Sequence, residues 1–153
     1  MKENFTPEEW ENLLNLPYAV SMAVMVAAPS VMGVWGETKA MIQEPARLAA
    51  ESGSALVGLL LAELQSQAKD LIKEQQNLWK HDQAGYRTKI IASCTAAVGA
   101  LSKVPPEEAL AYRKWVLAVG LKVAGAAKEH GVAVSDPEKE ALAEISAALG
   151  ISA

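Results

Sequence analysis

The longest uncharged stretch of the chain covers residues 12–36. It contains Pro17 and Pro29, and a proline inside a helix removes a backbone donor and crowds the preceding turn. We therefore expect Pro17 to bend or divide a helix that ends at Pro29. The piece between them, Pro17–Ala28, is too short for a membrane span, which needs about 20 consecutive apolar residues. The pattern predicts a buried core helix and no transmembrane span.

Residues 29–37 follow as a predicted loop, because they contain a proline and two glycines. Connecting segments are usually polar, whereas this one carries Met32 and Trp35. Its apolar side chains either close one end of a bundle or present a surface to a partner, such as another subunit. With Met25 these residues form the candidate surface for an apolar ligand or a partner, because methionine adapts to irregular shapes. Peripheral membrane contact through the same surface stays open.

Hydrophobic periodicity and capping residues predict helices along the rest of the chain. Apolar residues recur at intervals of three, four and seven, which is the spacing of one helix face. Thr6 and Glu9 have the spacing of a capping box, and Ser54 and Ser135 stand where helix caps are expected. Pro45 lies inside a predicted helix, where proline is unfavourable. No stretch alternates as a strand does. The predicted helices cover residues 7–16, 17–28, 37–53, 55–80, 87–103, 106–131 and 136–150.

These elements predict an all-α fold, a single compact bundle of about five to seven helices. The helix over residues 106–131 is apolar on two sides, which is typical of a helix buried at the centre. We expect it and the uncharged helix to form the core. One side carries Leu110, Leu117, Leu121 and Ala124, and the other carries Tyr112, Trp115, Val119 and Val123.

Composition narrows the class of protein. The chain has 153 residues, 51% hydrophobic and 21% charged, which is the balance of one globular domain. We expect residues 1–153 to fold as a single helical domain. Acidic residues outnumber basic ones by 18 to 14, for a net charge of -4, and the two kinds are interspersed. Nucleic-acid-binding domains usually carry a basic stripe, so nucleic acid is not an expected partner.

The single cysteine, Cys94, cannot form a disulfide within the chain, and its apolar helical context predicts a buried thiol. The first residues turn acidic at once and lack the order of a signal peptide. Both observations favour a reducing, cytoplasmic location.

Motifs for catalysis are missing from the sequence. It contains no Gly-x-Ser-x-Gly and no glycine-rich loop before a Lys-Ser/Thr pair. His81 and His130 stand at predicted helix ends, outside any Glu-x-x-His pair of the kind that binds metal in helical bundles. We therefore expect a protein that is not an enzyme and needs no cofactor.

Three carboxylates suggest an alternative function, the binding of a metal ion. Glu63, Asp70 and Glu74 are spaced by seven and four residues, which places them on one side of the long helix. Oxygen ligands in such a row suit a hard metal cation. The same residues, with Lys69 and Lys73 beside them, also fit a solvated helix face.

Two stretches resemble known families. Residues 130–152, "HGVAVSDPEKEALAEISAALGIS", resemble the final helical unit of the tellurite-resistance TerB-like proteins, in which a turn precedes a capped helix. Residues 5–30 are similar to the opening of a poorly characterised bacterial family of small helical proteins. The resemblances imply a bacterial helical bundle, a link to stress responses and metal binding through acidic residues. We expect a non-enzymatic protein that acts by protein interaction, with a homodimer as one form; the alternatives are the apolar-ligand or membrane-surface reading and the carboxylate metal site.

Overall fold

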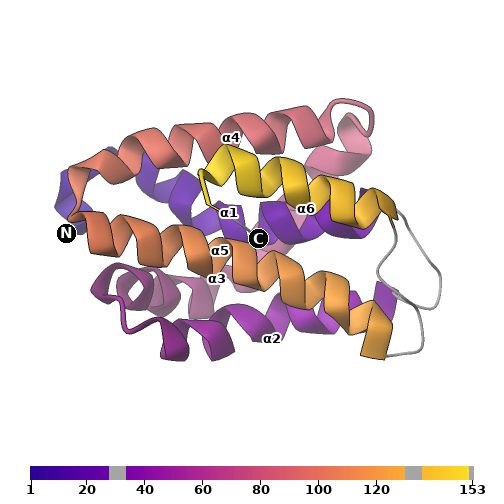
Figure 1. Cartoon of the computed structure of the whole chain (residues 1–153), viewed down its shortest axis with the longest axis horizontal. Coiled ribbons are helices and arrows are strands. Elements are labelled where there is room, and N and C mark those ends of the chain that lie inside the picture. The colour runs from indigo at the N-terminus through magenta and orange to yellow at the C-terminus, as the bar shows by residue number, and fades with distance from the viewer. Residues whose placement is uncertain (28–33, 130–135, 152–153) are drawn as a thin grey trace.

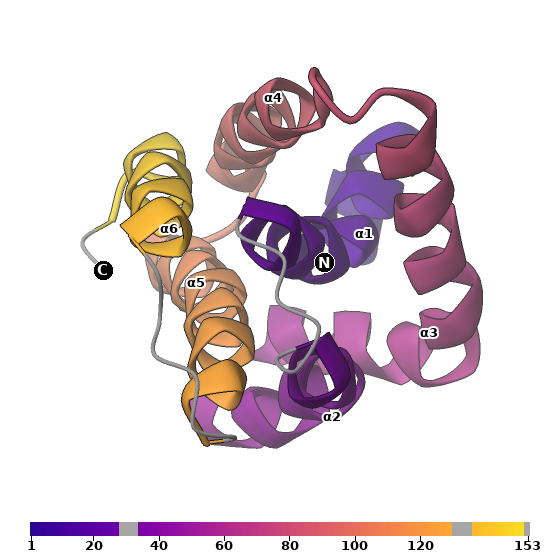
Figure 2. The ribbon, with the colours of Figure 1, turned by 90° about the vertical axis from the view of Figure 1, so that its right-hand side faces the viewer.

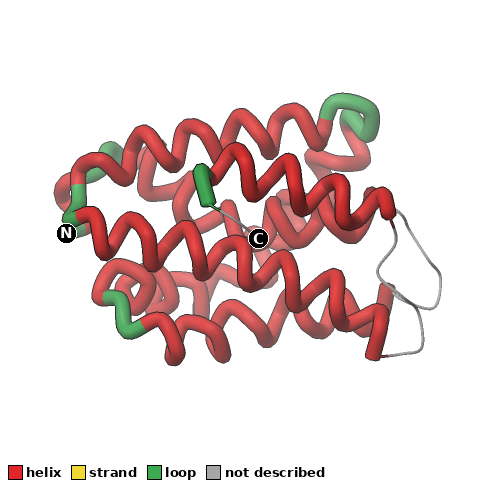
Figure 3. Tube along the Cα trace, viewed as in Figure 1, coloured by secondary structure: helices red, strands yellow, loops and turns green. Residues whose placement is uncertain are grey.

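Six α-helices account for most of the chain in a computed structural model (Figure 1). The structure describes residues 1–27, 34–129 and 136–151, with the side chains of 34–38 and 127–129 outside that description. Figure 3 shows no strand in this part of the chain, so the predicted all-α bundle is confirmed. The helices are α1 (Pro7–Ala27), α2 (Val34–Ser52), α3 (Ala55–His81), α4 (Tyr86–Ala100), α5 (Pro106–Glu129) and α6 (Asp136–Leu149), with short 3-10 turns η1 (Lys2–Asn4) and η2 (Leu101–Lys103).

Helix α1 forms the centre of the bundle. Figure 2 shows it inside a ring made by the other five helices, and it packs against each of them. Every residue from Leu16 to Met25 is buried, as expected of a helix that is apolar on all sides. The prediction of a core helix in the uncharged stretch is therefore confirmed, and one continuous cluster of buried side chains draws on all six helices.

Pro17 is predicted to bend or divide this helix. It does not divide it, because α1 is one continuous helix, and that part of the prediction is wrong. Pro17 has no N–H, so the carbonyl of Leu13 loses its usual donor four residues later. The hydroxyl of Tyr112, on α5, donates to that carbonyl over 2.8 Å. Tyr112 is fully buried. A side chain 99 positions away thus supplies the hydrogen bond that proline removes.

A second proline, Pro45, lies inside α2. Trp115 of α5 donates its indole N–H to the Pro45 carbonyl over 3.0 Å. The rings of Trp115 and Tyr112 meet edge to face, with centroids 5.9 Å apart. Helix α5 therefore joins α1 and α2 at their proline positions through two neighbouring aromatic residues.

The prediction of a loop over residues 29–37 is wrong at its C-terminal end, because α2 already begins at Val34. Gly36 is therefore a helical residue and not part of a loop. A single glycine inside a helix costs only about 1 kcal/mol, which the packing of the rest of α2 offsets.

The predicted capping residues lie where the helices begin. Thr6 and Glu9 form the capping box of α1, with bonds of 3.1 and 2.8 Å between backbone N–H and side-chain oxygens. The Ser54 side chain accepts from the N–H of Val57, 3.1 Å away, at the start of α3. Ser135 lies outside the described residues.

Glu108 adds a cap that reaches α3 from another helix. Its carboxylate accepts from the Ser54 hydroxyl and from the backbone N–H groups of Ala55 and Leu56, the latter two at 3.2 and 3.3 Å. The hydrogen bond from Ser54, followed by those from the backbone, holds the pKa of Glu108 below its usual 4.5. The carboxylate thus fixes the start of α5 against the start of α3.

Candidate functional site

The sequence-predicted surface around Met25 is not a surface in the described residues. Met25, near the end of α1, is only 8% exposed and belongs to the hydrophobic core. Met32 lies outside the described residues, and of Trp35 only the backbone, in the first turn of α2, is described. The Met-rich helix, as far as it is described, fills the bundle interior because the other five helices pack around this part of α1.

The structure does not bring the three predicted carboxylates together. Glu63 is held by other groups: it accepts from the indole N–H of Trp10 over 2.7 Å and pairs with the Lys2 ammonium over 3.2 Å. Asp70 and Glu74 are exposed further along α3. In the part of the chain that the structure describes, no three His, Cys, Asp or Glu side chains gather closely enough to hold a metal ion. The metal hypothesis therefore has no geometric support here.

The single cysteine is unsuited to nucleophilic chemistry. Cys94 is fully buried, and burial raises the pKa of its thiol to about 12. A nucleophilic cysteine must be present as the thiolate, so this one is inert, as its context predicts. His81 lies in the last turn of α3, and His130 is outside the described ranges.

Two exposed leucines share one face of α5, a helix that the sequence pattern placed wholly in the core. Leu110 is 36% exposed and Leu121 is 41% exposed, although Leu117 and Ala124 from the same predicted side are buried. The prediction was wrong on this side because α1 takes the centre, which leaves α5 in the outer ring (Figure 2). Hydrophobic periodicity identifies an apolar side but not what covers it.

Helical spacing places these leucines in one row with polar and small residues. Successive intervals of three, four, four and three residues follow one face of a helix. All members are at least partly exposed. We call this row the α5 stripe; it consists of Glu107, Leu110, Lys114, Ala118 and Leu121.

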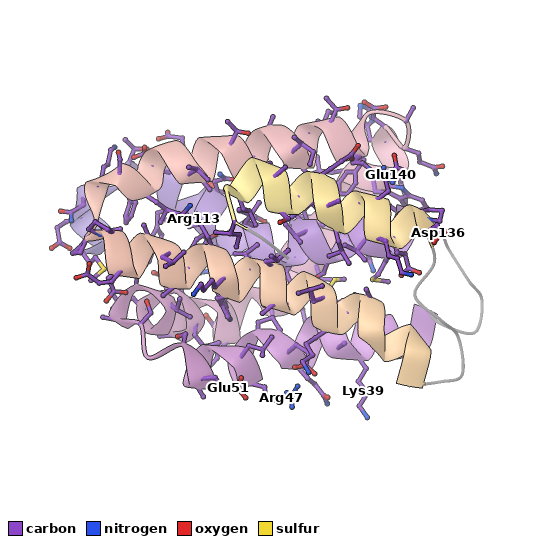
Figure 4. The ribbon with its side chains drawn as sticks, viewed as in Figure 1. Lys39, Arg47, Glu51, Arg113, Asp136 and Glu140 are labelled. Carbon is purple, nitrogen blue, oxygen red and sulfur yellow. The ribbon has the colours of Figure 1, made fainter. Side chains whose placement is uncertain are left out.

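A shallow groove of about 390 Å³ lies between α5 and α2, and all members of the α5 stripe except Leu121 line it. Its apolar wall includes Leu48 and Trp115, and Glu51 lies at its edge. Figure 4 shows Glu51 projecting from α2 together with Arg47 and Lys39. The α5 stripe therefore combines three apolar residues, Leu110, Ala118 and Leu121, with the charged side chains of Glu107 and Lys114.

The opposite flank of α5 is tied to α6. Arg113 donates to the carbonyl of Leu149 over 3.2 Å, and Figure 4 shows its side chain between the two helices. Contacts with α2, α1 and α6 hold the other sides of α5. The orientation of the α5 stripe toward solvent is thus fixed by packing around the rest of the helix.

Comparison with protein-family models, curated proteins and solved structures finds no match for this chain. Among the described residues, none of the helices combines the length and apolar character needed to cross a membrane, in agreement with the sequence. A functional proposal for this chain therefore rests on its own geometry.

Proposed function

We propose that the protein is a non-enzymatic interaction module that pairs with a second copy of itself through the α5 stripe. The observation that carries this proposal is the exposure of Leu110 and Leu121 on one face of a well-packed helix. Burying a fully exposed leucine side chain is worth about 1.5–3 kcal/mol, and because Leu110 and Leu121 are 36% and 41% exposed, each has about 0.5–1.2 kcal/mol left to gain. A twofold-symmetric contact uses the same patch on both copies, so each leucine would contribute twice.

The order of residues along the stripe suits an antiparallel pair of α5 helices. With a twofold axis near residue 116, Leu110 lies opposite the partner's Leu121, and Lys114 lies opposite the partner's Ala118. The small side chain of Ala118 leaves room for the lysine stem, which packs on apolar surface while its ammonium stays in water. The stripe is therefore complementary to itself in this arrangement.

Charge supports the same arrangement. Glu107 lies near the start of α5, and Lys122 is exposed about four turns later. In the antiparallel pair, Glu107 comes within one helical turn of the partner's Lys122, twice by symmetry. The opposed helix dipoles are also favourably aligned in this orientation. A parallel pair would instead bring like charges together, so charge selects the antiparallel form.

The setting of this module is part of the proposal. The inert, buried Cys94 suits a reducing cytoplasm, in which a protein carries no disulfides. The resemblance of residues 5–30 to a bacterial family suggests a bacterial source, and that of residues 130–152 to TerB-like proteins suggests a stress-related role; we include both in the proposal.

The proposal predicts that the Leu121→Asp variant is a monomer. Light scattering after size exclusion should give wild-type particles of twice the chain mass of 16.2 kDa. Because a buried aspartate replaces a leucine on both copies, we expect the dimer to weaken by about a hundredfold or more.

The matched control is Leu59→Asp, since Leu59 is 45% exposed on α3, away from the stripe. It should leave the dimer unchanged. A wild-type chain that stays monomeric at high concentration, or a Leu121→Asp variant that dimerises like wild type, would contradict the proposal.

A further inference from the structure

A second surface feature, independent of the α5 stripe, lies where the N-terminal turn meets α1 and α3. An open pocket of about 570 Å³ is lined there by Trp10, Phe5, Glu63 and Lys2, among others. Figure 1 shows the N-terminus at the end of the bundle where α1 begins. We call this feature the Trp10 pocket. Lys2 is the only basic residue in its lining, which also includes Glu3 and Glu11.

The centre of the pocket is an indole ring fixed against a carboxylate. Trp10 donates its N–H to Glu63 over 2.7 Å, which orients the ring and the carboxylate relative to each other. Phe5 packs on Trp10 with ring centroids 5.8 Å apart. Both aromatic side chains are otherwise buried in the core. The ring and the carboxylate therefore present a preorganised pair of surfaces to a third group.

That third group is the side chain of Lys2. Its ammonium lies 5.4 Å from the centroid of the Trp10 ring and 3.2 Å from Glu63. A cation within about 6 Å of a tryptophan face is attracted by the ring quadrupole. The Lys2 side chain is nonetheless 56% exposed and belongs to a single 3-10 turn, so little else holds it in place.

We infer that the Trp10 pocket binds a small alkylammonium cation, and that Lys2 occupies it as an internal ligand. The Lys2 side chain has the composition of n-butylammonium, so its position shows which chemistry the pocket accepts. Glu63 and Glu11 favour a cation over a neutral or anionic ligand, whereas Glu3 is already paired with the N-terminal ammonium over 2.8 Å. An external cation must displace Lys2, which competes as a tethered group at an effective concentration in the millimolar range.

Chemical rescue tests this inference. In the Lys2→Ala variant, n-butylammonium should move the NMR signal of the Trp10 indole N–H toward its wild-type position, with saturation. The same titration of the wild-type chain should show binding weaker by about threefold or more, because Lys2 competes. The Trp10 signal is assigned by its loss in Trp10→Phe.

Three controls separate a specific site from a general effect. The neutral isostere 1-butanol should leave the Trp10 signal of Lys2→Ala unchanged. Adding Glu63→Gln to Lys2→Ala keeps an acceptor for the indole but removes the charge, and should weaken binding by about threefold to tenfold. Lys39→Ala removes an exposed lysine on α2 and should bind as wild type does. No saturable shift in Lys2→Ala, or equal shifts with 1-butanol, would overturn the inference.

Discussion

Tyr112→Phe lowers the free energy of unfolding by about 1–3 kcal/mol, because it leaves a buried carbonyl without a partner. The ring remains to fill its place in the core, so the change isolates the hydroxyl. That hydroxyl is the donor to the Leu13 carbonyl, which Pro17 deprives of its helical N–H. Chemical denaturation followed by circular dichroism measures the loss.

Pro17→Ala provides the matched background for this measurement. Alanine restores an N–H that can donate to the Leu13 carbonyl, so the carbonyl no longer depends on Tyr112. In the Pro17→Ala chain, Tyr112→Phe should therefore cost less than in the wild-type chain, by about 1 kcal/mol or more. If Tyr112→Phe costs the same in both backgrounds, the tyrosine does not compensate for the proline.

Gly120→Ala should also destabilise the chain, although alanine is the better helix former. An added Cβ at Gly120 would lie 2.9 Å from Cγ1 of Val20 and 3.5 Å from Cδ2 of Leu142. Val20 is fully buried in α1 and is stiff because it is β-branched. The crowding should cost about 1–3 kcal/mol, against a gain in helix propensity of about 1 kcal/mol.

The control is Gly58→Ala, in α3. A Cβ there meets no atom within 4 Å, and the residue is exposed. This variant should be as stable as wild type or more stable, so that the two alanine variants differ by about 1–3 kcal/mol in the free energy of unfolding. Equal stabilities would show that α5 does not depend on close approach to α1 and α6 at Gly120.

The parts of the fold that the sequence predicts correctly follow from local rules. The capping box at Thr6 and the cap at Ser54 involve residues three positions apart, so the spacing of residue types is sufficient. The burial of residues 16–25 of α1 follows from their apolar character on every side. Each of these features requires only the neighbouring residues along the chain.

The errors arise where distant residues decide the outcome. Pro17 alone indicates a bent or divided helix, and only the contact with Tyr112 shows how α1 continues. The exposure of Leu110 depends on which helix takes the centre of the bundle. Glu63 belongs with Trp10, 53 positions away, and not with the acidic residues of its own helix. Periodicity carries no information about such pairs.

The central claim, antiparallel pairing of α5 in a dimer, is tested most directly by exchanging its two charges. Glu107→Lys and Lys122→Glu, made singly, should each weaken the dimer by about tenfold, because like charges meet twice across the twofold axis. The chain carrying both changes should regain wild-type affinity, measured by sedimentation equilibrium at low salt. Two single variants that dimerise like wild type, or a double variant that is weaker than either, would contradict the account.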